Sequence, residues 1–188
     1  MATKHIYGRV NMNGHAQAVA TGVKSKRSGI YLVKIHIWYI ERLVWIIAGG
    51  VLLAGSVLAA MNNINWSVIV LCTGLSSILV SLTGFCLIGN ILYRIGVMPL
   101  LEDSLKTGDK NKFYRMQTDV WYLERYIYLI VGTNLSLSAI LIKVHSPLWI
   151  WFPAFVGAAS IVFSFTGFCI LANMLYRLGA EPRLCRNL

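Results

Sequence analysis

Four long stretches of the chain are apolar and free of Asp, Glu, Lys and Arg. They run over 43–61, 66–92, 126–142 and 144–175. A helix needs about 20 such residues to cross a membrane, because lipid offers its backbone no hydrogen-bond partners. The pattern predicts an all-α membrane protein with four transmembrane helices.

The polar breaks between these stretches predict how the helices are connected. The first two stretches are separated by 62–65 (Asn-Asn-Ile-Asn), and the last two by Lys143 to Pro147. Pro147 favours a break because its φ angle is fixed and it has no amide hydrogen. Such short connections predict two tight helical hairpins, joined by a longer polar segment.

The distribution of cations predicts the orientation. All of the 17 Lys and Arg residues except Lys143 lie in the N-terminal segment, the middle segment or the C-terminal tail. The positive-inside rule then places both termini and the middle segment in the cytoplasm. Since the first 30 residues have no apolar core of a secretory signal, we expect a cytoplasmic tail there. The predicted location is a bacterial inner (cytoplasmic) membrane, crossed several times.

The composition excludes an ordinary soluble enzyme. Apolar residues make up 57% of the chain and charged ones 13%, with a mean hydropathy of +0.65. Soluble domains have about 25% charged residues. The net charge of +10 is explained by the topology and by contact with anionic lipid headgroups, so we expect no nucleic-acid partner.

The sequence repeats itself without a gap at an offset of 83 residues. Residues 38–42 (Trp-Tyr-Ile-Glu-Arg) recur at 121–125, and 83–96 recur in similar form at 166–179. The most distinctive shared positions of the second motif are Thr83, Gly84, Phe85, Cys86, Asn90 and Tyr93, matched by Thr166, Gly167, Phe168, Cys169, Asn173 and Tyr176. Because both copies enter and leave on the same side, we expect two parallel-repeat hairpins, related by a pseudo-twofold axis, in one four-helix bundle.

The repeat divides the chain into five parts. We expect a polar basic tail, a first hairpin repeat, a cytoplasmic linker, a second hairpin repeat and a short C-terminal tail, at 1–34, 35–101, 102–117, 118–184 and 185–188.

The Glu-Arg start of the first helix and the Gly-Phe-Cys motif of the second, in a hairpin of about 60 residues, resemble the transmembrane domain of YgaP-like inner-membrane proteins. The resemblance covers 38–101 and again 121–184. This family usually has Pro directly after the Cys, whereas Leu87 and Ile170 follow it here. The resemblance implies the hairpin fold. It does not carry over the sulfurtransferase activity of the rhodanese domain often found beside that family, because these 188 residues lack its catalytic loop.

Charged residues at the ends of the predicted spans form what we call the interfacial clamp. We expect Glu41 to pair with Arg94, and Glu124 with Arg177, because each hairpin begins and ends at the same membrane face. Such pairing compensates charges at the lipid boundary and favours a structural role over a substrate site. The clamp comprises Glu41, Arg42, Arg94, Glu124, Arg125 and Arg177.

Small and polar residues of the spans predict close helix packing. Asn90 and Asn173 are expected to hydrogen-bond a neighbouring helix. Glycines and serines form small-residue faces for close approach, at Gly49, Gly50, Gly55, Ser77, Ser81, Gly84, Ser160, Ser164 and Gly167.

Cys86 and Cys169 are the sharpest chemical candidates, and the pseudo-symmetry predicts that their thiols face each other. Buried cysteines usually behave as small apolar residues, and no neighbouring His or Lys is present to form a thiolate. The four histidines have no metal-ligand spacing. We therefore expect no catalytic residues, metal or cofactor.

Three functions remain open at this stage. The preferred hypothesis is a non-catalytic accessory or structural subunit of a larger inner-membrane complex, plausibly bioenergetic, that contacts other membrane subunits. The alternative is a channel or transporter for small solutes or sulfur anions, with Arg94 and Arg177 at its mouth. A thiol-redox protein using Cys86 and Cys169 is the weaker alternative.

Overall fold

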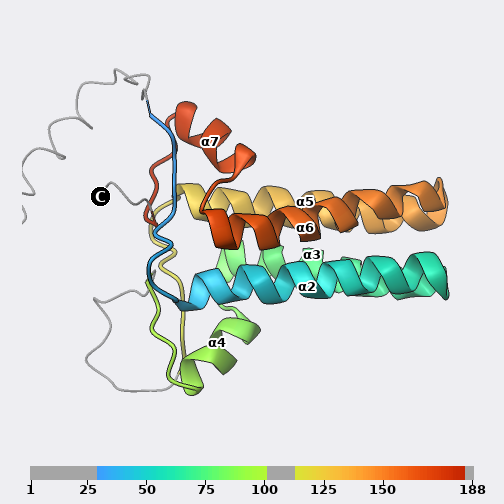
Figure 1. Cartoon of the computed structure of the whole chain (residues 1–188), viewed down its shortest axis with the longest axis horizontal. Helices are drawn as coiled ribbons and strands as arrows, with labels where there is room; N and C mark the ends of the chain where they lie inside the picture. Colours follow the sequence, from blue (N-terminus) through green and yellow to red (C-terminus); the bar gives the residue numbers. More distant parts are fainter. Residues whose placement is uncertain (1–28, 101–112, 185–188) are drawn as a thin grey trace, which may run out of the picture.

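A computed structural model describes residues 29–100 and 113–184 and confirms the all-helical membrane architecture. The four long helical stretches run side by side (Figure 1). They are α2, the continuous pair η1 and α3, α5, and the continuous pair η3 and α6, and each is long and apolar enough to cross a membrane. Their bounds are Ile40–Met61, Ile64–Trp66 with Ser67–Thr83, Leu123–Val144, and Pro147–Ile150 with Trp151–Thr166.

The second and fourth spans end earlier than the apolar pattern predicts. After Thr83 the chain turns at Gly84, whose φ of 71° terminates α3, and Gly167 terminates α6 with the same angle. These two glycines are therefore helix caps, because a left-handed conformation suits glycine. They are also closely packed, since a Cβ atom at Gly84 would meet the Met116 backbone and one at Gly167 would lie 2.9 Å from the Val33 carbonyl oxygen. The predicted close approach therefore exists, but it is to extended backbone and not to another helix.

Two short amphipathic helices follow, α4 (Leu87–Arg94) and α7 (Ile170–Arg177). They flank opposite sides of one end of the bundle (Figure 1), which we call the capped end.

The long helices pack most extensively across the two sequence repeats, with α2 against α6 and α3 against α5. A Cβ atom added at Gly49 would lie 2.7 Å from the carbonyl oxygen of Gly157. At the equivalent crossing, a Cβ atom at Gly132 would lie 2.7 Å from the carbonyl oxygen of Gly74. Both crossings bring backbone against backbone, as small residues allow in membranes. The prediction for Gly50 is wrong, because it is exposed and a Cβ atom there meets nothing within 4 Å.

Apolar side chains fill the middle of the bundle. Leu52 and Leu135, which are equivalent in the repeat, are buried and cluster with Val70 and Ala139. Close packing of this kind removes voids and gains dispersion energy along the whole contact.

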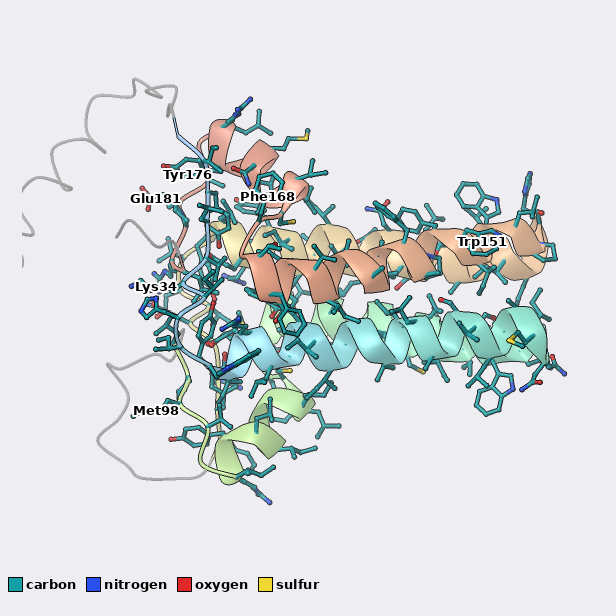
Figure 2. All side chains as sticks on the ribbon, viewed as in Figure 1. Lys34, Met98, Trp151, Phe168, Tyr176 and Glu181 are labelled. Atoms are coloured by element: carbon teal, nitrogen blue, oxygen red, sulfur yellow. The ribbon has the colours of Figure 1, made fainter. Side chains whose placement is uncertain are left out.

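Two extended segments cross the capped end and pack into its core, at 29–39 and 113–122. Figure 2 shows Lys34, Met98 and Glu181 at this end and Trp151 at the other. Tyr31 and Tyr114 are both buried, and Val33 and Met116 donate backbone hydrogen bonds to Gly167 and Gly84.

Tyr31 and Tyr114 precede the predicted boundaries at 34/35 and 117/118, and both belong to the core of the capped end. Most of the predicted N-terminal tail, most of the predicted linker and all of 185–188 lie outside the described residues.

Candidate functional site

The capped end holds two carboxylates in equivalent, fully enclosed positions. Glu41, near the start of α2, is 1% exposed and accepts hydrogen bonds from the Tyr114 hydroxyl at 2.7 Å and the Leu100 amide at 3.2 Å. Glu124, near the start of α5, is also 1% exposed and accepts from the Tyr31 hydroxyl at 2.9 Å and the Leu184 amide at 2.8 Å. Each tyrosine belongs to the other sequence repeat, so each carboxylate binds the repeats together.

The next residue in each helix is a buried arginine that binds the end of a helix in the opposite repeat. Arg42 donates from Nε to the carbonyl oxygen of Ser164 in the last turn of α6, at 2.7 Å. Arg125 does the same to Ser81 of α3, at 3.0 Å. The last carbonyls of a helix have no partner within it, and its C-terminus attracts a cation. The arginines therefore stabilise the points where α3 and α6 end.

Both arginines are enclosed on their other sides as well. The Nη1 atom of Arg42 donates to the Ile35 and Ile37 carbonyls, while that of Arg125 donates to Thr118 and Val120. Their guanidinium carbons also lie over indole rings, 3.9 Å from the Trp38 centroid and 4.1 Å from the Trp121 centroid. All these donors have partners, so the guanidiniums are positioned to hold the extended segments.

The predicted pairing of the clamp with α4 and α7 needs correction. Glu124 does not pair with Arg177, because Tyr31 and the amides of Arg183 and Leu184 surround its carboxylate. Arg94, the partner predicted for Glu41, ends α4, and its guanidinium lies 5.8 Å from the ring centroid of Phe113. Both arginines lie on short helices that the sequence pattern merged with the long spans.

The hydroxyl that binds Glu41 remains a proton donor over the ordinary pH range. Burial raises the pKa of Tyr114 well above its usual value, and the nearby charge of Glu41 raises it further. Burial also raises the pKa of Tyr39 and of Tyr122, with Glu41 and Glu124 as the next causes. The hydroxyls of Tyr39 and Tyr122 are buried without a hydrogen-bond partner among the described residues. Nothing in the sequence predicts this burial.

Asn90 and Asn173 connect the short helices to the extended segments, and the prediction that they bind a neighbouring helix is wrong. Asn90 donates to the carbonyl of Tyr114 at 2.9 Å, and Asn173 to that of Tyr31 at 3.1 Å. Their partners are extended backbone and not a neighbouring helix. The hydrogen bonds orient the same tyrosines that bind the carboxylates.

The two repeated cysteines are not brought together. Cys86 and Cys169 are the N-cap residues of α4 and α7, which lie on opposite sides of the bundle (Figure 1). The Sγ atom of Cys86 accepts a hydrogen bond from the Gly89 amide at 3.3 Å. Burial raises the pKa of Cys86, although that hydrogen bond lowers it. The geometry gives this thiol a capping role.

The remaining motif residues also serve local structure. Thr83 and Thr166 donate to carbonyls one turn earlier and accept from the amides of Phe85 and Phe168 across the caps. Tyr93 and Tyr176 pack near Tyr114 and Tyr31, with ring centroids 6.4 Å and 6.2 Å apart.

Within 29–100 and 113–184, no group of three or more His, Cys, Asp and Glu residues is placed to hold a metal ion. Comparisons with protein-family models, curated proteins and solved structures found no match to this chain. The resemblance to YgaP-like transmembrane domains therefore stays a prediction.

Proposed function

We propose that this protein is a non-catalytic accessory subunit of a larger assembly in a bacterial inner membrane, with both termini in the cytoplasm. One observation carries the expectation of a membrane partner. Asn134 lies at the middle of α5 with its side chain exposed, and its amide nitrogen donates to the Ile130 carbonyl at 2.8 Å. The side-chain oxygen has no hydrogen-bond partner among the described residues.

An exposed amide oxygen in hydrocarbon favours a donor from another helix, because lipid supplies none. Such interhelical bonds contribute on the order of 1 kcal/mol in membranes. Thr133 lies next to Asn134, is exposed, and donates to the Leu129 carbonyl. These two residues are the polar part of the face on which we expect a partner helix to dock.

The four buried charges support a structural role. Glu41, Arg42, Glu124 and Arg125 are two acidic and two basic residues, and each binds a group of the opposite repeat. Groups enclosed by such fixed partners serve to hold the bundle together. A substrate would have to displace these hydrogen bonds, each worth about 1.5–3 kcal/mol when one partner is charged.

The two alternatives receive less support. A conduction path along the bundle would have to pass Leu52 and Leu135, which belong to one buried apolar cluster at its centre. Arg94 and Arg177 lie on opposite flanks and do not form one mouth. A thiol-redox pair would need Cys86 and Cys169 together.

The decisive experiment expresses the protein at its natural level and analyses it by native electrophoresis in mild detergent. Asn134→Val is the test variant. Val is the residue at the equivalent position, Val51. We expect the native protein to migrate with a complex, and Asn134→Val to release a folded chain. Leu82→Ala, on an exposed site of α3, is the matched control and should stay in the complex. A free 21 kDa monomer in every case would contradict the proposal.

The orientation has its own test. A cysteine introduced by His145→Cys, next to the hairpin connection, should react with a membrane-impermeant maleimide added outside intact spheroplasts. Cys185 should react only after the membrane is opened. The opposite pattern would place the termini outside.

A further inference from the structure

A cavity of about 230 Å³ opens on one side of the bundle, between α2, α3 and α4. Most of its lining belongs to the apolar spans, so its mouth faces the hydrocarbon of the membrane. Cys72 and Ser76 are exposed at this face of α3, and Leu87 is exposed at the start of α4. Its walls include Trp45, Ala48, Cys72, Ser76, Leu87 and Tyr128.

Two hydroxyls and one thiol in the wall already have partners, whereas the Ser76 hydroxyl has none among the described residues. Thr73 donates to the Ile69 carbonyl at 2.8 Å, and Ser77 donates to the Thr73 carbonyl at 3.0 Å. The Cys86 thiol accepts from Gly89. A bound water needs two to four polar partners, and most of this wall is apolar. A hydrocarbon chain instead gains dispersion contacts along the whole cavity.

Two cations lie on segments that adjoin the cavity at the capped end. Arg94 is in the last turn of α4, whose first residues line the cavity. Arg115 is exposed, and its backbone forms a bridge with Phe85, directly before Cys86. A guanidinium binds phosphate through paired hydrogen bonds.

We propose that this cavity is a binding site for one phospholipid of the adjoining leaflet. One acyl chain fills the cavity alongside Trp45 and Tyr128, and the phosphate lies within reach of Arg94 and Arg115. The site goes beyond the subunit proposal and does not depend on it, because it needs only the bundle and a membrane.

The second repeat differs at the equivalent positions and provides matched controls. Phe163 corresponds to Val80 and Asn134 to Val51, so that side carries a larger ring and a polar amide where the cavity wall has aliphatic groups. Ala159 is the exposed counterpart of Ser76.

The test uses the full chain in vesicles of phosphatidylglycerol that carries a diazirine on one acyl chain. After illumination, adducts are mapped by mass spectrometry. Trp45 is only 7% exposed, so ordinary contact with the bilayer does not label it. We expect adducts at Trp45 and Tyr128, lost in Ser76→Trp and retained in Ala159→Trp.

A second pair of variants covers the case in which Ser76→Trp does not fold. Val51→Phe should reduce the adducts at Trp45, whereas Asn134→Phe should not. Replacing Arg94 and Arg115 together by Gln should reduce labelling by the phosphatidylglycerol probe. Labelling by a diazirine fatty acid in its uncharged, protonated form should be reduced less. No adduct at Trp45, or equal labelling in the cavity-filling and control variants, would overturn the proposal. Labelling by fatty acid alone would refute phospholipid as the occupant.

Discussion

The two neighbouring glycines of α2 allow a sharp test of how the repeats pack. Gly49 faces α6, and a Cβ atom there would lie 2.7 Å from the Gly157 carbonyl oxygen and 2.9 Å from Cγ1 of Ile161. Ordinary contact begins near 3.4 Å, so Gly49→Ala forces the two helices about 0.7 Å apart at this crossing. Gly50→Ala meets nothing within 4 Å.

Both substitutions gain the same helix propensity, about 1 kcal/mol, so the difference between them isolates the packing effect. Overpacking costs about 1–3 kcal/mol, and we expect Gly49→Ala to be less stable than Gly50→Ala by that amount. The measurement is unfolding in mixed micelles with increasing SDS, followed by circular dichroism. Equal midpoints, or a more stable Gly49→Ala protein, would refute the close α2–α6 crossing.

Three further predictions concern the capped end. Glu41→Gln and Glu124→Gln should each lower the free energy of unfolding by about 1.5–3 kcal/mol and reduce the yield of folded protein. The exposed control Asp119→Asn should change neither. Normal stability with lost solute flux would contradict the structural role. Burial raises the pKa of Tyr114 above its reference value of 10.0, so its contribution to stability is complete below that pH and declines as the pH rises above it. Melting temperatures measured from about pH 9 to about pH 11 should therefore fall less steeply in Tyr114→Phe, and identical slopes would count against this tyrosine. Cys86 should resist a water-soluble maleimide at neutral pH until SDS unfolds the protein, since burial raises its pKa; rapid labelling of the native protein would show a reactive thiol.

The long spans were predictable because their physics is local. A helix in lipid needs only length and apolar composition, and all four stretches have both. The breaks after Thr83 and Thr166 were not predicted, because α4 and α7 continue the same charge-free pattern up to Arg94 and Arg177. The repeated glycine of Thr-Gly-Phe-Cys was the available signal, since a glycine often ends a helix.

The partners of the buried charges depend on long-range packing that spacing within one hairpin does not reveal. Glu41 and Arg94 approach the same membrane face, which suggested a pair. The two repeats pack against each other instead, and this packing brings Tyr114 to Glu41. One signal was present in the sequence. Tyr31 and Tyr114 are separated by the same 83 residues as the rest of the repeat, which extends it to the segments that cover the carboxylates.

The central claim is that the two repeats interlock, with helices and charges bound across them. Oxidative cross-linking of a variant with both Gly49→Cys and Ser160→Cys tests it most directly, in a background without native cysteines. A Cβ atom at position 49 lies 3.2 Å from that of Ser160, close to the range of about 3.5–4.5 Å in disulfides. The account predicts a rapid bond within one chain for this pair and none for Gly50→Cys with Ser160→Cys. Equal cross-linking of both pairs, or of neither, would contradict it.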